Sequence, residues 1–288
     1  MNYRSEIDGL RALAVIPVIF FHAGFNTFSG GFVGVDVFFV ISGYLITSII
    51  VNDIENKNFS IISFYERRAR RILPALFLVM LACLPFAWMW MVPIQLKDFS
   101  QSIIAVSLFA SNFLFWRESG YFDAAAEEKP LLHTWSLAVE EQYYLIFPIF
   151  LLMIWGLGKN KVFWLIIILA TASLIFSEWS WRNTPSANFF LAPTRAWELF
   201  AGSIAAFIVK KRGVQKSSIL SSLGLGAIIL AIFAYDKTTP FPSFYTLLPI
   251  LGVCLIIIYG DRATLTGKLL STKALVGIGL ISYSAYLW

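Results

Sequence analysis

Long apolar stretches alternate with short polar loops along the whole chain. A stretch of about 20 apolar residues has the length that crosses a bilayer as a helix. Such segments are predicted near residues 9–27, 32–51, 72–92, 99–116, 131–155, 162–178, 190–209, 218–234, 243–259 and 274–288. The pattern therefore predicts an all-α fold, a polytopic transmembrane helix bundle with about nine to ten membrane segments, as one domain over residues 1–288.

The positions of Lys and Arg predict how these segments are oriented. Basic residues cluster in the predicted loops at 66–71, 159–161, 210–216 and 262–273. Because cytoplasmic loops carry an excess of Lys and Arg, we expect all four loops and the N-terminus in the cytoplasm. An even number of crossings between residues 72 and 156 is then required. The short, serine-rich segment 99–116 is the best candidate for one that does not cross, which leaves nine crossings.

Composition narrows the class of protein. The chain is 58% hydrophobic and only 14% charged, which is typical of an integral membrane protein. Basic cytoplasmic loops explain the net charge of +5 better than a nucleic-acid partner does. Cys83 and Cys254 lie in apolar runs, which favours buried thiols over a disulfide framework or a metal site. The last apolar segment stops at Trp288, so we expect the domain to be incomplete at its C-terminal end.

One pair of ionisable residues in the first segment is the main candidate for chemistry. The chain has two histidines, and His22 follows Arg11 by eleven residues in an apolar run. Eleven residues turn a helix through about 1100°, so both side chains share one face. An ionisable group within a membrane segment normally faces a protein interior or a water-filled cavity and indicates function. His22 is therefore a candidate general base.

Three more ionisable residues interrupt apolar segments. Asp36 is expected near the same outer end as His22. It could orient the histidine, bind a polar substrate, or pair with an arginine to hold the bundle together. Arg195 and Glu198 are three residues apart and can pair within one helix.

Gly43 predicts close packing between helices.

Two other groups of polar side chains are candidate binding sites. The basic cluster could be an orientation signal that touches anionic lipid, or a clamp for a phosphorylated donor; its members are Arg67, Arg68, Arg70 and Arg71. The second group, at the head of the segment 131–155, predicts a polar pocket and consists of His133, Trp135, Ser136, Glu140 and Glu141. A Ser-His-Glu triad is conceivable there, but spacing within one helix rarely gives triad geometry.

Taken together, the motifs resemble membrane-bound acyltransferase family 3, the O-acyltransferases that modify bacterial surface polysaccharides. The motifs that carry the resemblance are residues 6–11 with His22, then 34–47, 67–74, 133–142 and 282–288. The chain looks like the branch in which an SGNH-type domain often follows the membrane domain.

The resemblance implies a reaction in the bacterial inner (cytoplasmic) membrane. An acyl-CoA such as acetyl-CoA would be the donor substrate, with no bound cofactor. A hydroxyl of an envelope glycan, such as lipopolysaccharide O-antigen, would be the acceptor. The family's essential arginine–histidine pair matches Arg11 and His22, with Asp36 as a third catalytic candidate.

The resemblance also assigns the two polar groups. An Arg-x-x-Arg pair is associated with the donor, and both Arg67/Arg70 and Arg68/Arg71 fit that spacing. The remaining polar residues would shape the acceptor pocket; they are His133, Trp135, Ser136, Glu140, Glu141, Arg195 and Glu198.

Two other functions stay open at this point. A polytopic transporter could use the intramembrane histidine, aspartate and arginine as a relay, although the sequence shows no inverted repeat. An inactive, truncated remnant is the second alternative, although every polar motif is present. The expected partners are the lipid bilayer, an acyl-CoA and a glycan, and not nucleic acid.

Overall fold

The computed structural model describes residues 3–119 and 129–288, and these ranges contain helices and no strand. The helices are α1 (Ser5–His22), α2 (Gly34–Glu55), α3 (Ile61–Trp90), α4 (Pro93–Ser107), α5 (Ser111–Arg117), α6 (Thr134–Ile154), α7 (Lys159–Asn183), α8 (Pro185–Phe190), α9 (Ala192–Arg212), α10 (Ser218–Ala234), α11 (Leu247–Tyr259), α12 (Leu265–Leu270) and α13 (Lys273–Leu287). The predicted all-α class is confirmed.

Helix length and composition agree with a membrane bundle. Four helical segments are long and apolar enough to span a bilayer: Gly31–Glu55, Ile61–Trp90, Thr134–Leu157 and Lys159–Asn183. Three apolar helical segments are shorter: Ser218–Ala234, Phe244–Tyr259 and Lys273–Leu287. Helices α1 and α9 are similar in length, but ionisable residues interrupt their apolar runs.

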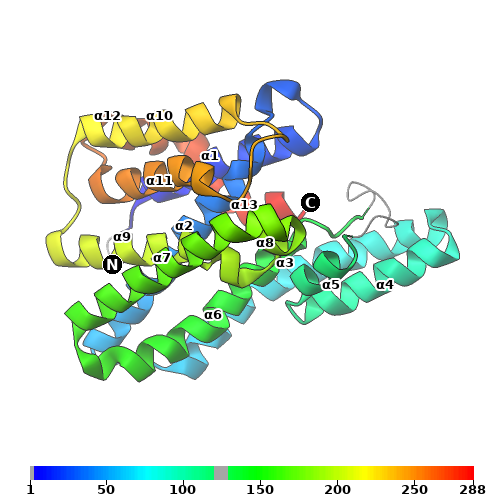
Figure 1. The fold of residues 1–288 in the computed structure, drawn as a ribbon, viewed down its shortest axis with the longest axis horizontal. Helices are drawn as coiled ribbons and strands as arrows, with labels where there is room; N and C mark the ends of the chain where they lie inside the picture. Colours follow the sequence, from blue (N-terminus) through cyan, green and yellow to red (C-terminus); the bar gives the residue numbers. More distant parts are fainter. Residues whose placement is uncertain (1–2, 120–128) are drawn as a thin grey trace.

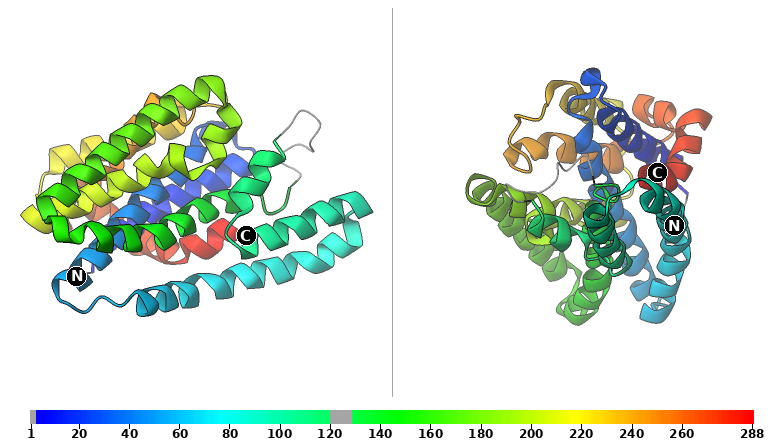
Figure 2. Two further views of the ribbon diagram at one scale, coloured as in Figure 1. Left: turned by 60° about the horizontal axis from the view of Figure 1, so that its bottom comes forward. Right: turned by 90° about the vertical axis from the view of Figure 1, so that its right-hand side faces the viewer.

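Helices α1 and α2 lie in the middle of the molecule (Figure 1). Helix α2 packs along α9, and α1 packs along α13. Helices α10, α11 and α12 cover one side, while α6 and α7 lie on the other. Helices α3 and α4 form an antiparallel hairpin along the edge of this body (Figure 2). The middle helices are thus enclosed by protein, whereas the hairpin has few neighbours.

Close packing between α2 and α9 depends on glycine. A Cβ atom added to Gly43 would overlap the backbone carbonyl of Leu199, and one added to Gly202 would overlap that of Val40. The backbones of the two helices therefore approach each other as only small residues allow. The close packing predicted at Gly43 is confirmed.

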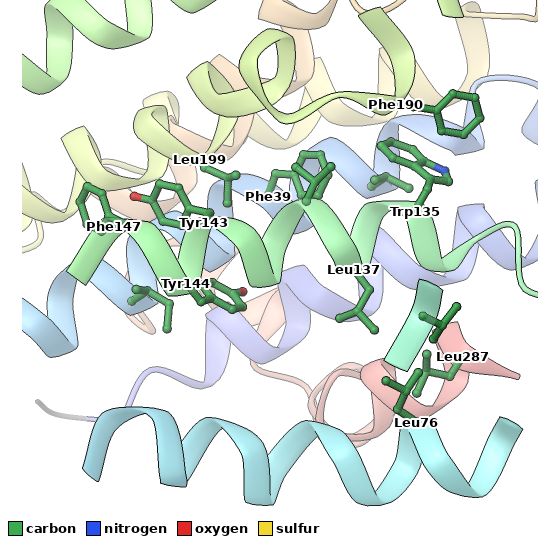
Figure 3. Packing of buried hydrophobic residues seen from close by; sticks show 14 of the residues in the cluster. Phe39, Leu76, Trp135, Leu137, Tyr143, Tyr144, Phe147, Phe190, Leu199 and Leu287 are labelled. Carbon is green, nitrogen blue, oxygen red and sulfur yellow. The ribbon is translucent and has the colours of Figure 1, made fainter. Parts of the chain in front are cut away.

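Helix α6 has two different buried faces (Figure 3). On one face, Trp135, Tyr143 and Phe147 point towards α2 and α9, where the ring of Tyr143 stacks on that of Phe147 at 4.6 Å between centroids. On the other face, Leu137 and Tyr144 point towards α3 and α13. Polar residues on α6 are therefore divided between two separate environments.

Two expectations from the sequence, about the basic cluster and about the end of the first segment, differ from the structure. The basic cluster 67–71 was expected in a loop but lies within α3, which begins at Ile61 after the cap Ser60. Apolar side chains at Phe64 and Ile72 are buried against the body, which extends the helix backwards through the arginines. The first segment ends at His22 rather than at 27, so His22 is an exposed residue at the end of α1.

The segment expected over 99–116 is not one helix. It is divided between α4 and α5, and Phe109 between them has a left-handed φ of 51°. The two helices have 15 and 7 residues, and each is shorter than the roughly 20 residues needed to cross a bilayer. This agrees with the expectation that the segment does not cross.

Candidate functional site

A cavity of about 200 Å³ lies between α1, α2, α3, α6 and α13, and we call it the central cavity. Much of its lining is aliphatic or aromatic, including Phe38, Leu45 and Ile49 of α2. The polar side chains along its wall come from all five helices; they are Arg11, Ser42, Arg68, Arg71, Ser136, Glu140, Glu141, Tyr144, Ser282, Tyr283 and Tyr286. Motifs far apart in the sequence therefore meet at one place.

The structure distinguishes the two possible arginine registers. Arg68 and Arg71 line the central cavity. Arg67 lies 3.6 Å from Asp53 with 59% of its side chain exposed. Arg70 pairs with Glu66 at 2.7 Å, and its side chain is 79% exposed. The four arginines thus divide by helix face, and only the Arg68/Arg71 register faces the cavity.

Two cations in the cavity are incompletely paired. Arg71 makes no hydrogen bond or ion pair with any residue of the described ranges. Arg11 has only Asp8, at 3.6 Å, and it lies close enough to Arg71 for the two positive charges to repel each other. An anion bound between the two guanidinium groups would relieve this repulsion. Both guanidinium groups are therefore available to an anion.

Arg68 is held more firmly than Arg71. Its guanidinium lies 4.0 Å from the centroid of the Tyr144 ring, and its Nη2 atom is 3.6 Å from Oε1 of Glu141. The same three side chains also line a second cavity of about 270 Å³ on the α4–α6 side. Arg68, Glu141 and Tyr144 therefore form a wall between two cavities.

Glu140 faces the central cavity from α6. One carboxylate oxygen accepts a hydrogen bond from Ser42 at 3.1 Å, and the other accepts one from Tyr144 at 3.0 Å. The bond from Ser42 joins α2 to α6, and the bond from Tyr144 lies within α6. Glu140 is thus a fixed part of the wall, and its negative charge partly balances the arginines.

The two histidines are not among the residues that line the central cavity. His22 ends α1 and His133 immediately precedes α6, and their charges are close enough to interact. Nδ1 of His22 is 2.8 Å from the carbonyl oxygen of Val18. A carbonyl only accepts, so in neutral His22 the proton is on Nδ1 and Nε2 has a free lone pair. This is the form that a general base requires.

Tyr286 connects the cavity to His133. Its hydroxyl donates to the backbone carbonyl of His133 at 2.9 Å and is 2.6 Å from the hydroxyl of Ser136. Ser136 also donates to the backbone carbonyl of His133. Ser136 therefore bonds to the backbone of His133 and not to its imidazole, while Glu140 bonds elsewhere. The described residues do not form a hydrogen-bonded Ser-His-Glu triad here.

Asp36, Arg195 and Glu198 lie outside the central cavity in an ion cluster of their own. Nη1 of Arg195 is 2.6 Å from Asp36 and 2.9 Å from Glu198, and none of the three side chains is more than 1% exposed. Trp135 belongs to this cluster, because its ring lies 5.2 Å from the Arg195 guanidinium. Asp36 thus has an arginine partner, which was one of the interpretations of the sequence.

The structure adds residues that the sequence did not single out. Tyr144, Tyr283 and Tyr286 line the central cavity together with Ser42. Tyr283 and Tyr286 lie in the motif 282–288, which supported the resemblance but suggested no role. No group of His, Cys, Asp or Glu that could hold a metal ion occurs in residues 3–119 and 129–288.

Comparison with known proteins identifies the class to which this fold and site belong. Residues 4–288 match the family described as an acyltransferase domain. The chain belongs to this acyltransferase family. No solved structure matches it.

Two relatives cover the whole chain. The peptidoglycan O-acetyltransferase OatA of Listeria monocytogenes is 35% identical over an alignment of 305 positions that covers 100% of this chain and 49% of the relative. The O-acetyltransferase OatA of Staphylococcus aureus is 33% identical over an alignment of 304 positions that covers 100% of this chain and 50% of the relative. The chain spans about half the length of these relatives.

Proposed function

We propose that this chain is an integral membrane O-acetyltransferase, which moves an acetyl group from acetyl-CoA to a hydroxyl of an envelope glycan. The family and the names of the relatives support the reaction type. The observation that carries the proposal is the central cavity, which is lined by the incompletely paired Arg11 and Arg71 and is connected to the turn of His133 through Ser136 and Tyr286.

The donor fits the chemistry of the cavity. Acetyl-CoA carries several phosphate charges, and arginine binds phosphate through charge-assisted hydrogen bonds. Arg11 and Arg71 would hold part of that charge, while the apolar wall of α2 would accept the uncharged arm and its thioester. In this arrangement the end of the cavity beside Arg71 faces the cytoplasm. The N-terminus lies on the same side of the membrane. The acetyl group is then carried towards His22.

His22 would act as the general base. Its Nε2 takes the proton of the acceptor hydroxyl as the oxygen attacks the thioester carbonyl. A new C–O ester bond forms and the C–S bond breaks, so that CoA leaves as a thiolate and takes up a proton. His22 is exposed at the end of α1, so a large acceptor can reach it.

The acceptor is proposed from the names of the relatives. One relative is named for peptidoglycan, which favours peptidoglycan as the glycan over the lipopolysaccharide O-antigen suggested by the sequence. His133, Ser136 and Tyr286 are at the end of the site where that hydroxyl would enter. Besides the bilayer of the bacterial cytoplasmic membrane, the proposed partners are acetyl-CoA and this glycan.

The variant His22→Gln tests the proposal. Glutamine keeps a polar group of similar reach but takes up no proton, so we expect acetyl transfer to fall by about 10² to 10⁴. Transfer from radiolabelled acetyl-CoA to a peptidoglycan fragment is measured in proteoliposomes. Unchanged elution in detergent and unchanged acetyl-CoA affinity provide the control. Near-normal transfer by His22→Gln would remove the base role, and no transfer by the unmodified chain would overturn the proposed function.

A further inference from the structure

Tyr286 is in contact with two parts of the site at once. Its side chain lines the central cavity, and its hydroxyl bonds to the turn that holds His133. The function proposed above places Tyr286 at the acceptor end of the site but gives its hydroxyl no task. The position of Tyr286 near the end of α13 therefore needs its own explanation.

The end of α13 holds His133 in several ways. The Tyr286 hydroxyl donates to the backbone carbonyl of His133 and contacts the Ser136 hydroxyl at 2.6 Å. The edge of the Tyr286 ring meets the imidazole, with 5.6 Å between ring centroids. The backbone of the next residue, Leu287, also interacts with the His133 side chain. These contacts restrict both the backbone and the ring of His133.

The remaining nitrogen of His133 is buried and free. Nε2 is enclosed by protein and has no hydrogen-bond partner in the described ranges. A buried polar atom without a partner is costly, so a group that the structure does not contain is expected to use it. His22 is near enough for the two charges to interact. The orientation of His133 therefore decides what that nitrogen faces.

We propose that Tyr286 is a positioning residue, which fixes His133 beside His22 at the end of the central cavity. The inference rests on the proposed function, because it assigns the pair of histidines to the acceptor end of the reaction. The Tyr286 hydroxyl does not touch the reacting atoms in this role. Through its hydrogen bond, Tyr286 fixes the position of the His133 imidazole relative to His22 and to the acyl group in the cavity.

Tyr283 provides a matched control on the same helix. It also lines the central cavity, and it lies one turn earlier on α13. Its hydroxyl donates to the backbone carbonyl of Ile72 on α3 at 3.1 Å. The variants Tyr286→Phe and Tyr283→Phe therefore remove the same atom from the same cavity wall. Only the first removes a bond to the His133 turn.

The first measurement does not depend on activity. The chain has two histidines, so labelling of the imidazole nitrogens gives two sets of NMR signals in detergent micelles. His22→Gln assigns them. We expect Tyr286→Phe to move the His133 signals and Tyr283→Phe to leave them in place. Unchanged His133 signals in Tyr286→Phe, or equal shifts in both variants, would overturn the positioning role.

The second measurement asks whether that geometry matters for transfer. Because misplacement of a reacting group by about 1 Å can cost roughly 10²-fold in rate, we expect Tyr286→Phe to lower kcat by at least about tenfold. The KM for acetyl-CoA should change by less than about twofold, and the pH profile of kcat/KM should shift. Tyr235→Phe, which loses one hydrogen bond to a backbone carbonyl far from the cavity, should keep normal activity.

The outcomes separate this inference from the proposed function. A rise in KM with kcat unchanged would make Tyr286 a part of the donor wall and overturn the inference. Moved His133 signals with normal kcat would show that this geometry does not matter for transfer, which also overturns it. If the unmodified chain transfers no acetyl group, the proposed function fails, and the NMR comparison still decides whether Tyr286 positions His133.

Discussion

Two groups of charge lie on different sides of α2, and they differ both in burial and in the pairing of their cations: the cluster of Asp36, Arg195 and Glu198 is enclosed, whereas Arg71 in the wall of the central cavity is exposed. In the cluster of Asp36, Arg195 and Glu198, one guanidinium bonds to two carboxylates, and the side chains are enclosed by protein. In the central cavity, Arg71 has no partner among the described residues and Arg11 has only a distant one. Both groups consist of ionisable residues in apolar helices.

The difference separates two roles for buried charge. Ionisable groups within a membrane are costly and often mark function, but both groups satisfy that description. The charges of the cluster are enclosed, so a ligand cannot reach them even though Oδ2 of Asp36 and Oε2 of Glu198 have no hydrogen-bond partner in the described ranges, and their main effect is on folding. A cation that lines a cavity and lacks a partner is available to an anion. Access from a cavity is therefore what distinguishes the two groups.

The largest effect is expected for Arg195→Met. It would leave two enclosed carboxylates side by side with no cation, and breaking a buried ion pair typically costs about 3–5 kcal/mol. We expect little folded protein, as measured by size-exclusion elution and thermal unfolding in detergent. Normal folding with loss of acetyl transfer alone would instead place the cluster in the functional site.

A smaller effect on binding is expected for Arg71→Gln. Each lost charge-assisted hydrogen bond to a phosphate costs about 1.5–3 kcal/mol, so the affinity for acetyl-CoA should fall between roughly tenfold and 150-fold. Folding should be unchanged, because Arg71 has no partner to lose. Calorimetric titration of the purified chain with acetyl-CoA measures the change.

Arg70→Gln is the matched control for Arg71→Gln. It removes the same charge from the neighbouring position of α3, but from an exposed pair with Glu66, which is worth about 0.3–0.5 kcal/mol. Its acetyl-CoA affinity should remain normal. An equal loss of affinity in both variants would mean that the donor responds to the total charge of α3 and not to the cavity.

The smallest effect is expected for Glu141→Gln. The Arg68–Glu141 distance of 3.6 Å is too long for a hydrogen bond, and Arg68 keeps its stacking contact with Tyr144. We expect a loss of about 1 kcal/mol in unfolding free energy and less than a threefold change in acetyl-CoA affinity. A loss of affinity as large as that of Arg71→Gln would show that Arg68 also needs Glu141 to bind the donor.

Local relations between residues could be predicted from the sequence. The helical spacing of Arg195 and Glu198 predicted their ion pair. Gly43 predicted a close contact between helices, and the structure shows that α9 makes this contact. The helical class followed from the length of the apolar runs. The ion pair depends on residues within one helix, where the geometry of 3.6 residues per turn fixes their relation. The contact at Gly43 was predictable as a close approach because a missing side chain permits it, but its partner helix was not.

Relations between distant segments could not be predicted in this way. Asp36 and Arg195 are 159 positions apart, and no spacing rule connects them. The same is true of Tyr286 and His133, which come together only because α13 packs between α1 and α3. The break at Phe109 was also missed, since a left-handed residue within an apolar run leaves no mark on periodicity.

The sparse packing of α3 has a thermodynamic consequence. Helix α3 carries Arg68 and Arg71 of the cavity wall, yet apart from its hairpin partner α4 it contacts mainly α13. A ligand that binds only the folded chain stabilises it by RT ln(1 + [L]/Kd), which is about 2.7 kcal/mol at one hundred times Kd. Because the anionic donor would be held between α1 and α3, this stabilisation would be concentrated on the most weakly attached helix. Saturation with donor would then slow amide hydrogen exchange in α3 more than in α2 or α9, which are already enclosed.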